Sequence, residues 1–444
     1  QLPKIYEFVQ LDNKTVGLIA MFLILILAFS GMNLGPVLLT VGFWGMVYVA
    51  GSKVALSVLG IAPYSTPASY NYSVYPLFML MGTIIFAGGI GENIFKAVNK
   101  WFGHLAGGIG IATIVGSAFF AAISGSATAM VATMGKVVIP EMRKYKYNDK
   151  LATGVIAAGG TIGVLIPPST ILILYGILTQ QPIGKLFMAG FLPGIMKTIT
   201  YIIVTIILCK KNPDWGPRAP EKPSFKEMVI SVKYIWPIIF LFIVVIGGMY
   251  AGVFTPTEAA GVGAFGAYVV AVIGRKFSPM KDLFNSGVEV TRIMGRMFTV
   301  LIGATTFGYF LALTRAPFEL ANFIVNLGYN RYILITIIIV IYLILGSIMD
   351  IFSVFVISVP IIYPVVTSLG FDPIWFGVLG TWLFEIGALT PPIGINVFTL
   401  RNIVKDIPLG TIFAGVAPFY ISDMVMIIAL VAFPQIATFL PSLM

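Results

Sequence analysis

Two double prolines interrupt apolar segments that are long enough to cross a lipid bilayer. Pro167-Pro168 lies within GGTIGVLIPPSTILILY (159–175), and Pro391-Pro392 lies within EIGALTPPIGINVFTL (385–400). A proline has no backbone N–H and clashes with the preceding turn, so nearby carbonyl groups lose their helical partners. Irregular backbone at membrane depth is tolerated only when it is buried in protein or lines a polar cavity. The two segments therefore predict broken helices beside a binding cavity.

A small, polar interruption precedes each double proline at a nearly equal offset. Ser124-Gly125-Ser126 stands before the first, and Gly346-Ser347 stands before the second. We interpret this as an internal repeat in which each unit contains a hairpin with a small tip, followed by a broken helix. Paired interruptions in the two halves of a membrane chain indicate the binding site of a secondary transporter. Close helix packing by small residues is the alternative explanation for any single position.

The composition is that of a polytopic membrane protein. Hydrophobic residues make up 58% of the 444 residues and charged residues only 10%, whereas soluble domains carry about 25% charged residues. The net charge of +10 comes from basic residues in short loops, which favours membrane topology over nucleic-acid binding. The single cysteine and single histidine argue against a cysteine metal site and against a Ser-His-Asp hydrolase, so we expect no enzyme.

The basic loops predict the orientation of the chain. Clusters at 143–150, 210–226 and 275–281 are assigned to the cytoplasm by the positive-inside rule. Both termini are then expected outside, and the hairpins at 105–140 and 332–365 enter from opposite sides as an inverted repeat. The amphipathic stretch 92–104 suits the membrane interface, and 57–73 is expected to be a polar loop or interfacial segment.

Five regions follow from this topology. The order is scaffold, transport repeat, scaffold, transport repeat and a final helix. They comprise scaffold helices with an interfacial helix (1–104), a first transport repeat (105–182), scaffold helices with a basic cytoplasmic loop at 210–230 (183–331), a second transport repeat (332–402) and a C-terminal helix (403–444).

If the substrate is an anion, helix N-termini that follow the breaks can hold it. Such termini offer backbone N–H groups and the positive end of a helix dipole. The hydroxyl groups of the first tip can join them, and Arg315 could supply a bidentate carboxylate partner, although our topology puts it outside. The candidate substrate residues are Ser124, Ser126, Ser169, Thr170, Asn396 and Arg315.

Two acidic residues receive separate predictions. Asp350 is the single acid in the apolar run 332–370, and a carboxylate in a membrane segment suggests function. A coupling role and a structural role as a cap or a partner of Arg315 both remain open for it. Glu258 follows Thr255 and Pro256 with the spacing of a capping box, which predicts a helix start.

Several motifs together resemble the large membrane subunit (M subunit) of the TRAP (tripartite ATP-independent periplasmic) transporters. They are ISGSATAMVATMG, AAGGTIGVLIPPS, LFMAGFLPGI, GVFTPTEAAGVGA, the tip 346–350 and GALTPPIGIN. The resemblance implies an all-α, elevator-type, sodium-coupled importer of organic acids in the bacterial or archaeal inner membrane. It also implies a small four-helix membrane subunit and a periplasmic substrate-binding protein as partners. No organic cofactor and no nucleic acid are expected, and membrane lipid surrounds the chain.

Sodium is the coupling ion that the resemblance implies, and it prefers hard oxygen ligands such as the carbonyl groups freed at a helix break. By motif position, one sodium ion would lie near the first tip and the first break, and the other near the second tip and the second break. The first set is Ser124, Gly125, Ser126, Gly163, Ile166 and Pro167; the second is Gly346, Gly387, Thr390 and Ile393.

Two other kinds of transport protein fit parts of the pattern. A stand-alone ion-coupled carboxylate symporter would share the architecture without a binding protein, and a channel would share broken helices without the inverted hairpins. C4-dicarboxylates, sialic acid and other sugar acids all remain possible substrates.

Overall fold

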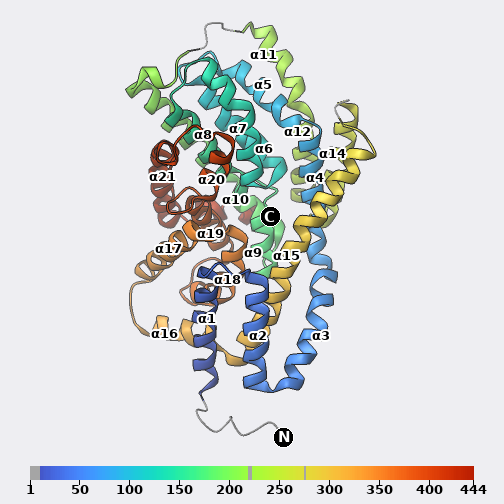
Figure 1. Cartoon of the computed structure of the whole chain (residues 1–444), viewed down its shortest axis with the longest axis vertical. Coiled ribbons are helices and arrows are strands. Elements are labelled where there is room, and N and C mark those ends of the chain that lie inside the picture. The colour runs from blue at the N-terminus through green and yellow to red at the C-terminus, as the bar shows by residue number, and fades with distance from the viewer. Residues whose placement is uncertain (1–10, 219–222, 275–276) are drawn as a thin grey trace. The chain divides into compact units, whose positions relative to one another are not determined.

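The computed structural model describes residues 11–218, 223–274 and 277–444, except for the side chains of residues 90 and 121–124. The described residues form helices joined by short links (Figure 1). The helices are α1 (Asn13–Phe29), α2 (Leu34–Ala50), α3 (Ser52–Ala68), η2 (Tyr70–Ser73), α4 (Val74–Ala87), α5 (Ile90–Phe102), α6 (Gly108–Ser124), α7 (Ala127–Lys144), α8 (Asp149–Gly160), η3 (Thr161–Val164), α9 (Thr170–Thr179), α10 (Ile183–Lys211), η4 (Pro213–Trp215), α11 (Phe225–Ser231), η5 (Val232–Tyr234), α12 (Trp236–Phe242), the π-helix η6 (Ile243–Gly247), α13 (Gly248–Tyr250), α14 (Pro256–Ile273), α15 (Lys281–Thr314), α16 (Ala316–Asn326), α17 (Arg331–Ile348), α18 (Ile351–Ser368), α19 (Pro373–Gly387), α20 (Ile395–Ile403), α21 (Leu409–Ala432), α22 (Gln435–Thr438) and η7 (Pro441–Leu443).

Length and composition identify the membrane segments among the described residues. Six helices are long and apolar enough to span a bilayer, or up to eight if each of two bent helix pairs counts as one span. The six are α10, α14, α15, α17, α18 and α21. The all-helical, polytopic fold predicted from the sequence is therefore confirmed, while the orientation of the termini stays a prediction.

The chain divides into two compact units. Unit 1 comprises residues 1–72, 292–338 and 353–372, and unit 2 comprises residues 73–291, 339–352 and 373–444. Helices α15, α17 and α18 each contribute residues to both units.

Close helix contacts at small residues hold unit 1 together. Helix α2 packs against α1 and α3, and α1 packs against α16. A Cβ added at Gly42 of α2 would lie 2.8 Å from the Cα of Phe307 in α15, so the two backbones meet where no side chain intervenes, as is common between membrane helices. The expectation of a polar loop over 57–73 is wrong, because helix α3 runs through Pro63 and Pro67 to Ala68.

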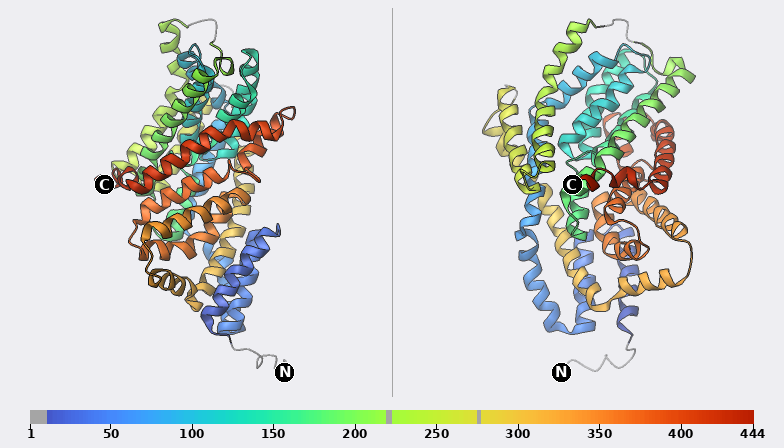
Figure 2. Two further views of the ribbon diagram at one scale, coloured as in Figure 1. Left: turned by 90° about the vertical axis from the view of Figure 1, so that its left-hand side faces the viewer. Right: turned by 180° about the vertical axis from the view of Figure 1, so that it is seen from behind.

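Unit 2 contains both double prolines. Within it α4 runs alongside α14 (blue and yellow in Figures 1 and 2), α5 packs on α6, and α8 packs on α21. A Cβ at Gly154 of α8 would lie 2.6 Å from the carbonyl carbon of Gly415 in α21, which fixes these two helices in direct backbone contact. Helix α10 packs against α19, α21 and α9.

The capping box predicted at Glu258 is confirmed. The Thr255 Oγ1 accepts a hydrogen bond from the Glu258 N–H at 3.3 Å, and Glu258 Oε2 accepts one from the Thr255 N–H at 2.8 Å. Pro256 is the first residue of α14, where its missing N–H costs nothing.

Candidate functional site

The first double proline ends one helix and precedes another. Helix α8 ends at Gly160, η3 ends at Val164, and α9 begins at Thr170. The peptide bond between Pro167 and Pro168 is cis, and residues 161–169 are all buried. The break predicted from the sequence is confirmed, and it is enclosed by protein as irregular backbone within a membrane requires.

The first tip lies against this break. Helix α6 ends at Ser124 and α7 begins at Ala127, with Gly125 between them at φ +56°. The Thr170 Oγ1 donates a hydrogen bond to the Gly125 carbonyl oxygen at 3.1 Å. A Cβ added at Gly125 would lie 3.1 Å from the carbonyl oxygen of Pro168. The structure thus brings the Gly125 tip and the Pro167 break together.

The second break has the same organisation. Helix α19 ends at Gly387 and α20 begins at Ile395, after a cis peptide bond between Pro391 and Pro392. Gly394 supplies the left-handed conformation, at φ +62°, from which α20 starts. Its lack of a Cβ makes that conformation accessible.

The second tip contacts the second break through two glycines. A Cβ added at Gly387 would lie 2.6 Å from the Cα of Gly346, so the backbones of α17 and α19 touch there. The Ile393 N–H also donates to the Ser347 carbonyl oxygen at 3.3 Å. Each predicted tip therefore lies on its predicted break, within unit 2.

Asn396 links the two breaks. Its backbone N–H donates to the Ala388 carbonyl oxygen at 3.1 Å, and its Nδ2 donates to the Ala157 carbonyl oxygen of α8 at 3.4 Å. The Asn396 side chain is buried, and its Oδ1 has no hydrogen-bond partner among the described residues. Because this free atom is an acceptor and the backbone N–H is already paired with Ala388, neither offers a donor to a carboxylate, and the substrate role of Asn396 stays a prediction.

The other substrate candidates have more local roles in the structure. Ser126 caps α7 by accepting from the Ala129 N–H at 3.4 Å, and Ser169 caps α9 by accepting from the Leu172 N–H at 3.3 Å. The side chain of Ser124 lies outside the described part of the structure. Arg315 directly precedes α16 and belongs to unit 1.

The sodium candidates lie at the two tips and breaks. Gly125 contacts Pro168 and Thr170 at the first break, where Gly163, Ile166 and Pro167 are buried, and Gly346 contacts Gly387 near the second, where the Ile393 N–H donates to Ser347. Thr390 Oγ1 donates to the Ile386 carbonyl oxygen at 2.7 Å, which leaves the lone pairs of its hydroxyl oxygen as possible ion ligands. Sodium binding at either group stays a prediction.

Asp350 occupies the link between α17 and α18. It follows Met349 and directly precedes the first residue of α18, and it is exposed within the described structure. Its place at the tip of the hairpin agrees with the sequence analysis. Neither the coupling role nor the structural role is decided by that place.

A buried charged cluster was missed by the sequence analysis. Lys197 of α10 and Asp423 of α21 form an ion pair at 3.5 Å, with side chains 0% and 1% exposed. Asp423 also accepts from the Tyr201 hydroxyl at 2.6 Å and from Trp382 Nε1 at 3.0 Å. The signal was present in the sequence, because each charge stands alone in a long apolar run, and such charges usually face a partner inside the protein.

Glu385 is a third titratable residue near this pair. It lies on α19 and is fully buried, with Lys197 and Asp423 near enough to affect it electrostatically. Both of its oxygen atoms lack a hydrogen-bond partner among the described residues. Two buried carboxyl groups therefore lie near Lys197 in the interior of unit 2.

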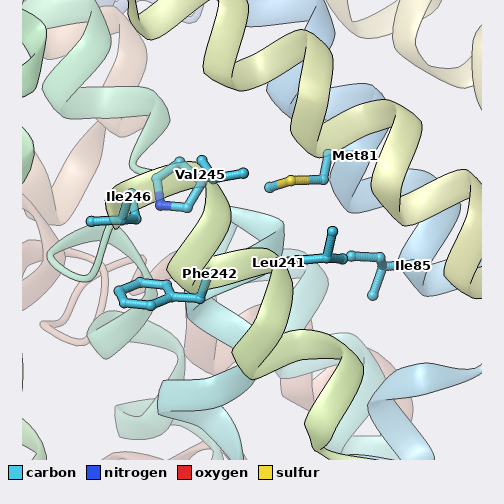
Figure 3. Close-up of a pocket in the computed structure, with 7 residues that line it drawn as sticks. Met81, Ile85, Leu241, Phe242, Val245 and Ile246 are labelled. Atoms are coloured by element: carbon cyan, nitrogen blue, oxygen red, sulfur yellow. The ribbon is translucent and has the colours of Figure 1, made fainter. Parts of the chain in front are cut away.

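An apolar pocket lies on the side of the first break next to α4 (Figure 3). Its lining residues are Met81, Ile85, Pro168, Leu241, Phe242, Val245 and Ile246. These side chains offer no polar group to a carboxylate.

The fold and the paired tips and breaks define a polytopic α-helical membrane transporter. Among solved structures, the chain resembles the Alcanivorax borkumensis YdaH transporter with a TM-score of 0.63, covering 96% of this chain and all of that one at 11% identity. At this identity the likeness concerns the fold alone.

Sequence comparisons define the family. Residues 19–436 match the model of the tripartite ATP-independent periplasmic transporter, DctM component. The chain is 30% identical to the C4-dicarboxylate TRAP transporter large permease protein DctM of Pseudomonas aeruginosa, over 86% of this chain and 89% of that protein. It is 32% identical to the sialic acid TRAP transporter large permease protein SiaM of Vibrio cholerae, over 84% and 87%. The chain belongs to the family of TRAP transporter large permeases, and it is a transport protein rather than an enzyme.

Proposed function

We propose that this chain is the permease of a sodium-coupled importer of small organic acids, with substrate bound between the tips and the breaks. The observation that carries the proposal is the duplicated contact: the Gly125 tip on the Pro167 break, and the Gly346 tip on the Pro391 break. Each break frees backbone carbonyl groups, which suit sodium, and starts a new helix, whose N–H groups suit a carboxylate.

The relatives support the class of substrate. Their names concern C4-dicarboxylates, sialic acid and, for the DctMQ permease of Oleidesulfovibrio alaskensis, isethionate. All three are organic acids that carry negative charge at neutral pH. The proposed substrate is therefore a small organic anion, with C4-dicarboxylates and sialic acid as the first compounds to test.

The partners are proposed from the same relatives. The chain matches only 64% of the DctMQ permease and 70% of the sialic acid permease SiaT of Haemophilus influenzae, so those chains contain a further part. A small membrane subunit fits that part, and a periplasmic binding protein fits the family's description. We propose both as partners in the inner membrane of a bacterium or archaeon.

The proposed transport cycle moves both breaks together. Both tips and both breaks belong to unit 2, which supports an elevator-type movement in which they keep their mutual contacts. Sodium entry supplies the energy, since each charge that crosses 100 mV contributes about 2.3 kcal/mol.

Uptake of radiolabelled organic acids into proteoliposomes tests this function. The vesicles contain the chain and its small subunit, with and without a sodium gradient and the binding protein. Uptake that requires both supports the proposal. Uptake with sodium alone would establish a stand-alone symporter, and flux that needs neither would establish a channel.

A further inference from the structure

Buried polar contacts connect the start of the first break to the helix before the second. The Thr161 hydroxyl, at the start of η3, donates to the Ala158 carbonyl oxygen at 2.7 Å and lies 3.1 Å from the hydroxyl of Tyr201. Tyr201 donates to Asp423 Oδ2 at 2.6 Å, and Trp382 of α19 donates to Asp423 Oδ1 at 3.0 Å. All four side chains are buried. Asp423 thus holds one group from α10 and one from α19 at the same carboxylate.

Lys197 provides the positive charge that this carboxylate needs. Its Nζ lies 3.5 Å from Asp423 Oδ2 and 5.4 Å from the centre of the Trp382 ring. Burying an ion pair costs several kcal/mol per ion, and apolar residues of similar volume often stabilise a core as well or better. The pair is therefore better explained by the geometry it imposes than by the stability it adds.

Helix α10 also packs directly against the residues of the first break. A Cβ added at Gly190 would lie 2.5 Å from the Leu165 carbonyl oxygen, and one at Gly194 would lie 2.7 Å from Ile166 Cγ1. Lys197 and Tyr201 follow on the same helix. The helix that supports the first break is thus bound, through Asp423, to the helix that ends at the second.

We propose that Lys197, Tyr201, Asp423 and Trp382 are positioning residues that fix the two broken helices to each other and thereby couple the two sodium sites. None of them contacts substrate or ion in this account. Sodium that orders one break would then favour the geometry of the other, so that sodium activates transport cooperatively. The network also keeps α10 and α21 with the broken helices during movement. This inference rests on the proposed sodium coupling.

Helix α19 offers a matched pair of variants. Trp382 and Trp375 are both fully buried, and each donates its Nε1–H to α21, Trp382 to Asp423 and Trp375 to the Leu430 carbonyl oxygen at 2.9 Å. Trp382→Phe and Trp375→Phe each remove one hydrogen bond between the same two helices. Only Trp382→Phe interrupts the network.

Tyrosine variants provide a second comparison. Tyr201→Phe removes the hydrogen bond to Asp423 and the polar contact with Thr161, whereas Tyr175→Phe removes a part-buried hydrogen bond to the Pro373 carbonyl oxygen. The readout is the sodium dependence of uptake, reported as a Hill coefficient and a half-saturating concentration. Substrate KM at saturating sodium and thermal stability are measured in parallel.

We expect wild-type sodium activation with a Hill coefficient above one. Trp382→Phe and Tyr201→Phe should lower it below the wild-type value and raise half-saturating sodium by about twofold to thirtyfold, with substrate KM nearly unchanged. Trp375→Phe and Tyr175→Phe should keep the wild-type Hill coefficient even if their stability falls.

Two results overturn the inference while leaving the proposed function intact. One is a wild-type Hill coefficient of one with sodium-dependent uptake, and the other is equal sodium dependence in the network and control variants. Sodium-independent uptake by the wild-type protein would instead refute the proposed function itself.

Discussion

Gly346 and Gly387 touch backbone to backbone, which places the tip of one hairpin directly on the end of a broken helix. A Cβ at Gly387 would lie 2.4 Å from the Gly346 carbonyl carbon, whereas a Cβ at Gly346 would lie 3.2 Å from the Phe384 ring and 3.3 Å from the Gly387 Cα. The contact therefore requires glycine most strictly at position 387. It therefore gives a direct way to disturb one proposed sodium site without changing a charge.

We predict that Gly387→Ala reduces sodium-driven uptake strongly. The added methyl group would lie 2.6 Å from the Gly346 Cα, so the tip must move away, at a cost typical of overpacking, about 1–3 kcal/mol. The control is Gly410→Ala in α21, where nothing lies within 4 Å of the added Cβ. Similar uptake by the two variants in proteoliposomes would argue against a functional contact.

A similar prediction applies to Gly125 in the first tip, and its control is a second glycine with a similar positive φ. Gly125→Ala places a Cβ both in a left-handed conformation and 3.1 Å from the Pro168 carbonyl oxygen. Gly328→Ala has a similar φ, +68°, with nothing within 4 Å. Both variants carry the left-handed strain of about 1–2 kcal/mol. We expect only Gly125→Ala to raise the sodium concentration needed for half-maximal uptake, and an equal rise in both would assign the effect to strain alone.

The buried ion pair predicts a rescue by a second substitution. Lys197→Met leaves Asp423 and Glu385 without their cation, and removal of one partner of a buried pair costs about 3–5 kcal/mol. The double variant K197M/D423N removes both charges of the pair and keeps a side-chain acceptor near the Tyr201 and Trp382 donors, so it should recover part of the lost thermal stability. Measurement of unfolding temperatures for the single and double variants in detergent checks this. A double variant less stable than either single variant would contradict it.

Tyr147 predicts an alkaline loss of stability. It lies in the link between α7 and α8, and burial raises the pKa of its hydroxyl to about 12. An unfolded tyrosine ionises near pH 10, so the contribution of the neutral phenol is complete below pH 10 and is lost as the pH rises through 12. Tyr147→Phe should flatten the pH dependence of the unfolding temperature in this range.

The same variant should also be less stable at neutral pH. The Ile109 N–H donates to the Tyr147 hydroxyl at 3.3 Å, and loss of a buried hydrogen bond costs about 1 kcal/mol. A variant with the wild-type unfolding temperature at pH 7 and the wild-type alkaline profile would show that the hydroxyl contributes nothing.

The sequence predicted the breaks because prolines act locally. Pro167 and Pro391 remove backbone donors wherever the chain places them, and their spacing from the glycine tips indicated the repeat. The capping box at Thr255 and Glu258 was equally local and is confirmed. The helix over 52–68 was missed because Pro63 and Pro67 suggested a loop, while the surrounding residues continue the helix past both.

The charged cluster could not be located in the same way. Lys197, Glu385 and Asp423 come from three helices far apart in the sequence, and their pairing depends on how α10, α19 and α21 pack. A search for lone charges in apolar runs would have found the three residues. It would not have shown that Asp423 joins the Tyr201 hydroxyl to Trp382.

The coupling of sodium entry to organic-acid entry is tested by measuring both radiolabelled solutes in the same proteoliposomes. We predict that both enter together, in a fixed ratio above one sodium ion per substrate, and only when the binding protein supplies the substrate. Sodium entry that does not depend on substrate, or substrate entry that continues without sodium, would contradict this coupling.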